Sequence, residues 1–172
     1  MTSDDPIYLD HNATTPLLPE VVEAMLPYLR RHFGNPSSAH AFGREAREAV
    51  ERARAEVALL LGCAADEVFF TSGGTESNNL AIRGAAEAQK ERRHVVTSAV
   101  EHPAVAVPCG WLEAHGWDVT RVGVDAEGRA SLEGLARAVG ERTALVTLMH
   151  ANNETGVLQP VGEAARIARE HG

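Results

Sequence analysis

The 172-residue sequence has no long run of apolar residues, few aromatic residues and only two cysteines. Without an apolar run of about 20 residues, no segment is expected to span a bilayer. The acidic amino terminus, Met1-Thr2-Ser3-Asp4-Asp5, is the opposite of the basic start of a signal peptide. These absences predict a cytoplasmic protein with no membrane partner.

Cys63 and Cys109 have no cysteine or histidine nearby at the spacing of metal ligands, so the sequence predicts no metal site. A disulfide is not expected in a reducing cytosol, and we expect both cysteines to be structural. The formal net charge of −8 argues against a nucleic-acid partner. An apolar content of 44% is ordinary for a globular domain with one sizeable core.

Residues 68–80 read Val-Phe-Phe-Thr-Ser-Gly-Gly-Thr-Glu-Ser-Asn-Asn-Leu. This pattern predicts a strand that breaks into a Gly-Gly turn at the start of a helix. Such a turn holds a phosphate through backbone N–H groups and the positive end of the helix. The chain lacks the Gly-x-x-x-x-Gly-Lys-Ser/Thr and Gly-x-Gly-x-x-Gly patterns of nucleotide-binding loops. An ordinary strand-to-helix loop remains the alternative for this segment alone.

Four further segments accompany the Gly-Gly turn. They are Ile-Tyr-Leu-Asp-His-Asn-Ala-Thr-Thr-Pro at 7–16, Phe-Gly-Asn-Pro-Ser-Ser at 33–38, Val-Glu-His at 100–102 and Met-His-Ala-Asn-Asn-Glu-Thr-Gly at 149–156. In this order and at this spacing, the five motifs resemble those of the cysteine desulfurases. That family belongs to the class V aminotransferase group of pyridoxal-phosphate (PLP) enzymes with fold type I. The resemblance covers essentially the whole chain.

The resemblance implies roles for four residues in a PLP site. Gly74 and Thr75 would contact the cofactor phosphate, and Thr75 could equally be a helix N-cap. His102 would stack on the pyridine ring and act as the catalytic group that moves protons. Asn153 would donate to the phenolic oxygen of the cofactor and lie near the substrate carboxylate, although turn formation alone would also explain it.

Asn12 and Asn35 are weaker candidates for contacts with the substrate, because each lies beside a proline-containing bend that it could simply shape. The other histidines are expected to be structural or solvated. Among these, His150 ends a predicted strand and could line the site.

The chain departs from the family in its shortage of lysine. A PLP enzyme needs a lysine that forms the Schiff base, and the single lysine here, Lys90, lies in the polar stretch Ala-Glu-Ala-Gln-Lys-Glu-Arg-Arg. In the family, this lysine, the Asp of the pyridine nitrogen, the cysteine nucleophile and the substrate-binding arginine lie further along. By resemblance, residues 1–14 belong to the small domain and residues 15–172 to an incomplete PLP-binding large domain. The chain alone is expected to be inactive.

The reaction implied is the conversion of L-cysteine to L-alanine, with the sulfur passed as a persulfide to an acceptor or iron–sulfur scaffold protein. The complete enzyme would be a homodimer. Two alternatives stay open. One is a selenocysteine lyase or another class V aminotransferase, and the other is a non-catalytic module that binds a phosphate ligand or pairs with a separate lysine-bearing chain.

The alternation of elements predicts an α/β fold with a mixed, largely parallel sheet and helices on both faces. Periodic apolar residues predict helices over Leu18 to Arg31, interrupted at Pro27, and over Arg44 to Leu61, closed by Gly62. Strands are predicted at Glu67 to Thr71, His94 to Ser98, Asp118 to Val124 and Ala144 to Met149. The remaining helices are expected over Thr75 to Lys90, Pro103 to His115, Ser131 to Val139 and Val161 to Glu170.

Overall fold

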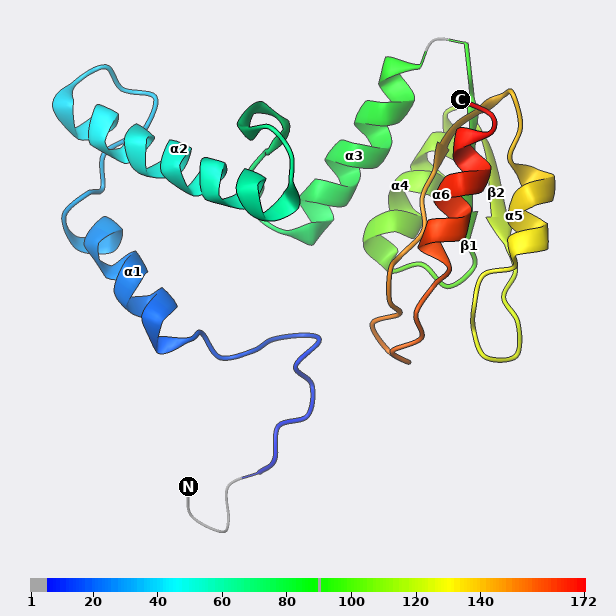
Figure 1. The fold of residues 1–172 in the computed structure, drawn as a ribbon, viewed down its shortest axis with the longest axis horizontal. Helices are drawn as coiled ribbons and strands as arrows, with labels where there is room; N and C mark the ends of the chain where they lie inside the picture. Colours follow the sequence, from blue (N-terminus) through cyan, green and yellow to red (C-terminus); the bar gives the residue numbers. More distant parts are fainter. Residues whose placement is uncertain (1–5, 90) are drawn as a thin grey trace. The chain divides into compact units, whose positions relative to one another are not determined.

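The computed structural model describes residues 6–89 and 91–172. The chain divides into two compact units, one ending at Phe70 and the other beginning at Thr71. The first contains helices α1 (Pro19–Arg30) and α2 (Ala41–Leu61) and the short 3-10 helix η1 (Ala65–Glu67). The second contains, in order, α3 (Gly74–Ala88), β1 (His94–Ser98), α4 (Pro103–Ala114), β2 (Asp118–Val122), α5 (Leu132–Ala138), β3 (Thr143–Val146) and α6 (Val161–Arg169) (Figure 1). Among the described residues, no helix is long and apolar enough to cross a membrane.

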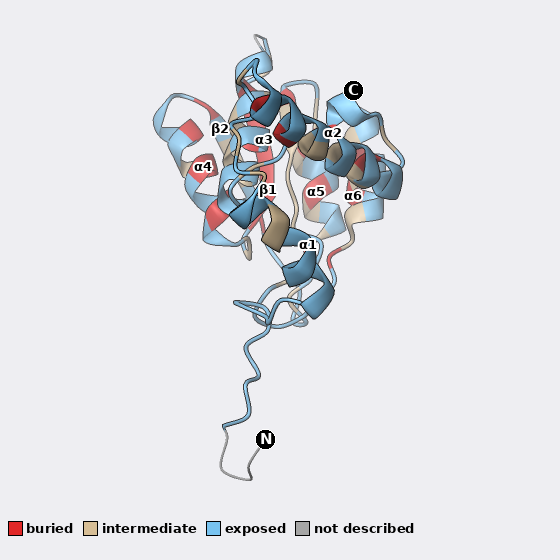
Figure 2. Cartoon of the chain, turned by 90° about the vertical axis from the view of Figure 1, so that its left-hand side faces the viewer, coloured by how far each residue is buried: buried red, intermediate tan, exposed pale blue. Residues whose placement is uncertain are grey.

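A parallel sheet of three strands, in the order β2-β1-β3, forms the centre of the second unit. Its register pairs His94 of β1 with Asp118 on one side and Thr143 on the other. The central strand β1 is buried along its whole length, as expected for a strand with neighbours on both sides (Figure 2). Helices α4 and α5 return the chain to the same edge of the sheet before β2 and β3, and α6 follows β3. The predicted α/β class is confirmed.

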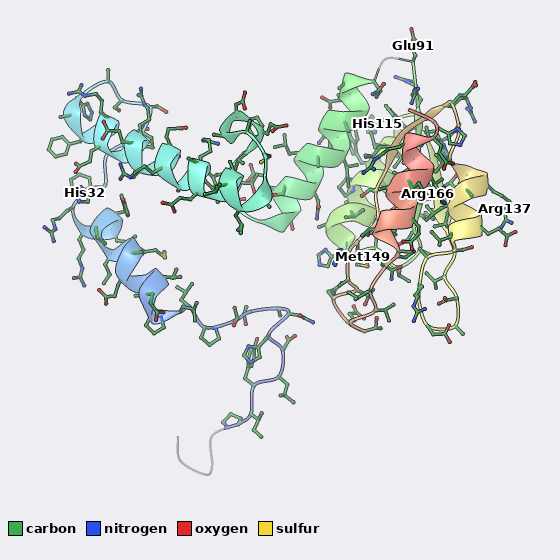
Figure 3. The ribbon with its side chains drawn as sticks, viewed as in Figure 1. His32, Glu91, His115, Arg137, Met149 and Arg166 are labelled. Carbon is green, nitrogen blue, oxygen red and sulfur yellow. The ribbon has the colours of Figure 1, made fainter. Side chains whose placement is uncertain are left out.

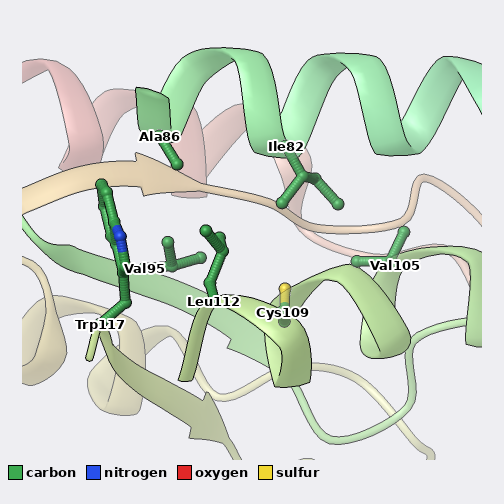
Figure 4. Close-up of a cluster of buried hydrophobic side chains, with 7 residues drawn as sticks. All are labelled: Ile82, Ala86, Val95, Val105, Cys109, Leu112 and Trp117. Atoms are coloured by element: carbon green, nitrogen blue, oxygen red, sulfur yellow. The ribbon is translucent and has the colours of Figure 1, made fainter. Parts of the chain in front are cut away.

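Helices cover both faces of this sheet. Successive residues of β1 point to opposite faces, so the strand contributes side chains to a packed cluster on each side. Val95 packs in a cluster with α3 and α4 that contains Ile82, Ala86, Val105, Cys109, Leu112 and Trp117 (Figure 4). Val96 packs on the opposite side in a second cluster, with Val122, Ala130, Leu135, Val139, Ala164 and Ile167. The sheet is therefore the middle layer of three.

In the first unit, α2 has well-defined ends. The Nδ1 atom of His40 accepts a hydrogen bond from the N–H of Gly43 at 3.3 Å and caps the start of the helix. Gly62 follows the last turn with φ 70°, a left-handed conformation that favours glycine, and closes the helix as the sequence predicts. The predicted apolar face of α2 is buried only in part, since Leu60 and Leu61 are 83% and 66% exposed.

The prediction of a strand over Glu67 to Thr71 is wrong. Val68 has extended backbone angles, but no strand among the described residues pairs with this segment. The carbonyl of Val68 instead accepts a hydrogen bond from the guanidinium of Arg54. Phe69 and Phe70 are 72% and 51% exposed, so the apolar run is not buried. A β-favouring composition forms a strand only where a partner strand supplies the other half of the ladder.

The sequence predicts that Pro27 kinks or ends the first helix, and the structure shows that it does not end α1. The helix continues to Arg30, and the N–H of Arg31 donates to the carbonyl of Pro27 at 2.8 Å. A proline removes one intrahelical hydrogen bond, and this one stands only one turn before the helix end.

Candidate cofactor site

His102 lies at the start of α4, directly after the loop that follows β1. Its Nδ1 atom accepts a hydrogen bond from the N–H of Ala104 at 3.0 Å, so the side chain is the N-cap of the helix. Pro103 occupies the first helical position, where its missing N–H costs nothing. Because Nδ1 accepts this bond, the proton of the neutral ring lies on Nε2.

Asn152 organises the loop that follows β3. Its side-chain oxygen accepts hydrogen bonds from the N–H groups of Glu154 and Thr155 at 3.0 and 2.9 Å. Its backbone carbonyl accepts from the N–H of Gly156, whose φ of 75° favours glycine. These bonds fold residues 152–156 into a tight turn with Asn153 at an exposed position on it.

The same Asn152 joins this turn to the loop after β1. Its Nδ2 atom donates to the carbonyl of Val100 at 3.2 Å. Because β1 and β3 are neighbouring parallel strands, their following loops leave the sheet at one edge. The structure therefore brings His102 and Asn153 onto two adjacent loops that are directly bonded to each other.

Glu101 makes a second connection between the two loops. Its Oε1 atom accepts hydrogen bonds from the hydroxyl of Ser98 at 2.6 Å and from the N–H of Met149 at 3.0 Å. Figure 3 labels Met149 where the chain leaves β3, and it labels His115 at the other end of α4, away from this loop. Neither Glu101 nor Asn152 has a site role in the sequence prediction, although both stand inside motifs that it uses.

The start of α3 carries Gly74 and Thr75. The N-cap residue is Gly73, which has no side chain. It therefore cannot cap the N–H groups of the first turn. Thr75 is the second helical residue and not the N-cap, which corrects that alternative. The hydroxyls of Thr71 and Ser77, 2.6 Å apart, tie the preceding loop to this turn.

Glu76, also in the first turn of α3, is turned back towards Ser72. One carboxylate oxygen accepts hydrogen bonds at 2.6 Å from both the hydroxyl and the N–H of that residue. These two bonds lower the pKa of the Glu76 carboxyl. The negative charge of Glu76 is thus held against Ser72, in the loop before α3.

The start of α3 faces the same edge of the sheet as His102. Figure 4 shows Ile82 on the side of Val105, in the first turn of α4, and Ala86 on the side of Trp117, which follows that helix. Since α3 runs from Gly74 to Ala88, its first residues point to the end of the unit where α4 begins.

Comparison with known proteins identifies the family of the chain. The family model for aminotransferase class V matches residues 7–172. The chain belongs to the aminotransferase class V family. It is 51% identical over 166 residues to the cysteine desulfurase IscS of Dictyoglomus turgidum, covering 96% of this chain and 42% of that protein. The IscS of Methanosarcina thermophila is 46% identical over 171 residues, covering 99% of this chain and 42% of the relative.

Solved structures of relatives give the same result. A NifS-like protein superposes with a TM-score of 0.92 at 42% identity, over 96% of this chain and 46% of the other. A structure of SspA in complex with cysteine gives 0.89 at 41% identity, over 95% of this chain and 48% of the other. The chain therefore spans less than half the length of these class V relatives.

The class V family to which the chain belongs is PLP-dependent, and the described residues fit part of that cofactor. The helix start at Gly74 suits a phosphate, and the joined loops carry the imidazole of His102 and the amide of Asn153 beside that edge. No lysine lies among the described residues, because Lys90 falls outside them. The fit covers the phosphate and ring sides of the cofactor only.

Asn12 and Asn35 belong to the first unit, so their predicted contacts with the substrate stay predictions. Asn35 shapes the bend before α2. Its Oδ1 atom accepts a hydrogen bond from the N–H of Ser37 at 2.9 Å, and its backbone carbonyl accepts one from the N–H of Ser38 at 3.0 Å. Asn12 is exposed in the turn that follows Asp10.

The two cysteines occupy different environments. Cys109 is fully buried in the cluster around Val95, and burial raises the pKa of its thiol. That environment suppresses the thiolate and suits a structural role. Cys63 is half-buried just after α2. Within 6–89 and 91–172, no group of three or more His, Cys, Asp or Glu side chains could hold a metal ion.

Proposed function

We propose that this chain is the first part of a PLP-dependent cysteine desulfurase. The observation that supports this most directly is the 46–51% identity, across almost the whole chain, to proteins named cysteine desulfurase. The site at the edge of the sheet also supports it. Gly74 and Thr75 at one helix start, and His102 and Asn153 on two bonded loops, are arranged around a common edge.

The start of α3 would bind the phosphate of the cofactor. The N–H groups of Gly74 and Thr75 and the Thr75 hydroxyl donate there, and the helix dipole adds a favourable positive potential. When bound, PLP supplies an electron sink for the amino acid substrate. No cationic side chain is needed at this end.

His102 would cover the ring and hold its proton at Nε2. Since Nδ1 accepts from the N–H of Ala104, Nε2 is the ring nitrogen that would face a substrate and donate its proton in a hydrogen bond, and the cap fixes the plane of the ring. Asn153 would donate its amide to the phenolic oxygen without adding a full charge. Asn12, Asn35 and Asn153 would contact the L-cysteine substrate.

The remaining groups would come from outside these 172 residues. The relatives are more than twice as long as the matched region, which leaves room for a Schiff-base lysine and a cysteine nucleophile. We propose that the complete protein is a homodimeric cytoplasmic enzyme that passes sulfur to an acceptor or iron–sulfur scaffold protein. The alternatives, a selenocysteine lyase, another class V aminotransferase or a half-enzyme module, differ in that missing half.

The full-length protein that carries this sequence tests the proposal. Purified with PLP and given L-cysteine and a thiol reductant, it is expected to release L-alanine and sulfide in equal amounts. Alanine formation only from selenocysteine would favour the lyase, and amino-group transfer to a keto acid would favour a transaminase. A full-length protein that binds no PLP would contradict the proposed function.

A further inference from the structure

Glu101 stands between the two loops of the site without any role in the reaction outlined above. One of its carboxylate oxygens, Oε1, receives the hydroxyl of Ser98 at 2.6 Å and the N–H of Met149 at 3.0 Å. The other, Oε2, is buried and meets no hydrogen-bond donor among the described residues. Burying a carboxylate is unfavourable unless hydrogen bonds compensate it, so these two bonds bear on how the site is held.

The position of Glu101 in the sheet explains what these bonds do. Regular pairing of β1 with β3 ends at Val96 and Val146, followed by one bond from the N–H of Thr147 to the carbonyl of Val96. Beyond that point, no backbone ladder joins the two strands. Glu101 spans 48 residues of sequence to reach Met149 and so continues the connection into the loops.

We propose that Glu101 is a positioning residue that sets the separation of His102 and Asn153 across the cofactor ring. This inference rests on the proposed function. Glu101 immediately precedes the cap of α4, and Met149 enters the turn organised by Asn152, so the carboxylate fixes both loops from one atom. Among the described residues, no hydrogen bond joins Glu101 to the start of α3, so the phosphate end is held separately.

A contact that only stabilises the fold would not change the cofactor spectrum when it is removed. The chain contains such a contact for comparison. At the other end of the same two strands, His94 Nδ1 of β1 lies 2.9 Å from the Thr143 hydroxyl of β3. Thr143→Val removes this hydroxyl while keeping the side-chain shape. It therefore loosens the same strand pair at the edge away from the site.

The test uses the full-length holoenzyme and the variants Glu101→Ala, Glu101→Gln and Thr143→Val. In Glu101→Ala, PLP content is expected to stay within about twofold of wild type, because the phosphate end is unchanged. The visible circular dichroism of the bound cofactor should lose at least about half its intensity, and kcat should fall about 10- to 100-fold, as for a misplacement near 1 Å. Deuterium uptake at residues 149–157 should become faster.

Glu101→Gln keeps an oxygen acceptor for both donors and is expected to recover most of the dichroism and of kcat. Thr143→Val should lower thermal stability with the cofactor spectrum and kcat unchanged. If Glu101→Ala does not fold, Ser98→Ala removes one of the two bonds and should give a smaller change in the same direction.

Wild-type dichroism and kcat in Glu101→Ala, or in Ser98→Ala where that variant replaces it, would overturn the inference. So would the same spectral loss in Thr143→Val. These outcomes differ from failure of the proposed function, which would appear as a wild-type protein without bound PLP.

Discussion

His102 combines two tasks in one imidazole ring. Its Nδ1 caps α4 and its Nε2 carries the proton, so the same hydrogen bond that stabilises the helix also fixes the orientation of the proposed catalytic group. Asn152 is the corresponding residue on the other loop, since its amide both shapes the turn around Asn153 and reaches Val100. Residues beside the proposed cofactor contacts thus determine where those contacts lie.

His94 is expected to give the stability of the second unit a pH dependence. Its two ring nitrogens each lie 2.9 Å from a threonine hydroxyl, Thr143 on β3 and Thr120 on β2. Burial, followed by the charge of Arg142, lowers the pKa of His94 from its usual 6.5, and the opposing effect of Asp118 is smaller. As the pH falls below about 6.5, the unfolded chain binds a proton at His94 before the folded chain does. The contribution of His94 to stability is therefore complete above that pH and is lost progressively below it.

His94→Gln removes this titration. Between about pH 7.5 and 5.5, we expect the wild-type unfolding free energy to fall more steeply than that of the variant, by at most about 1.4 kcal/mol per pH unit for one proton. Urea unfolding of the full-length protein and its variant, followed by tryptophan fluorescence, measures both slopes. Equal slopes would show that His94 does not titrate in this window.

Lys90 is not expected to serve as the Schiff-base lysine. Its sequence neighbours are polar or charged, so nothing in the sequence removes water from the amine. When the isolated chain is mixed with PLP, dialysed and reduced with borohydride, mass spectrometry should find no stoichiometric adduct on Lys90. A specific one-to-one adduct that survives the dialysis would refute this expectation.

At the scale of elements, the start of α4 can be separated from the chemistry. His102→Ala removes the cap and should destabilise the protein by about 0.5–2 kcal/mol, whereas His102→Asn replaces one capping side chain by another and should restore most of that loss. Both variants should lose the part of the turnover that depends on the imidazole. Unfolding free energies and turnover, measured on the same preparations, test the separation, and equal destabilisation of the two variants would argue against the capping role.

The elements that the sequence predicts well are those with local start signals. The β1 strand has the predicted bounds, and Pro103 and Ser131 mark the starts of α4 and α5, where the Ser131 hydroxyl accepts from the N–H of Gly134 at 3.0 Å. The prediction of a strand from Glu67 to Thr71 was wrong because a strand needs a partner strand, and local composition does not reveal one.

The site residues divide in the same way, into those that local motifs indicate and those that depend on distant contacts. His102 and Asn153 stand in motifs that point to them directly, and the structure places both on the predicted loops. The bonding of Glu101 and Asn152 could not be predicted, because their partners are backbone groups 48 and 52 residues away. Such contacts depend on which strands become neighbours, and that information is not local.

At the scale of the whole chain, large apolar side chains remain uncovered. Phe33, Leu59 and Phe69 are 75%, 83% and 72% exposed, and a cavity of about 570 Å³ between α1 and α2 is lined by residues that include Tyr28 and Val50. Within the described residues, β2 and β3 each pair on one side only. Exposed apolar surfaces and open strand edges promote association.

The isolated chain should therefore be oligomeric, prone to aggregation or only partly ordered. Size-exclusion chromatography with light scattering, together with a thermal melt, measures this. A monodisperse monomer with a sharp cooperative transition would contradict the expectation.

The central claim is that the two ends of the site have separate tasks, with the phosphate at Thr75 and proton transfer at His102. The most direct measurement is turnover of L-cysteine by full-length Thr75→Ala and His102→Ala, each with and without excess PLP. Thr75→Ala should lose cofactor and recover activity when PLP is added, whereas His102→Ala should keep its cofactor and stay about 10²- to 10⁴-fold slower. Wild-type turnover in His102→Ala, or equal rescue of both variants by PLP, would contradict the account.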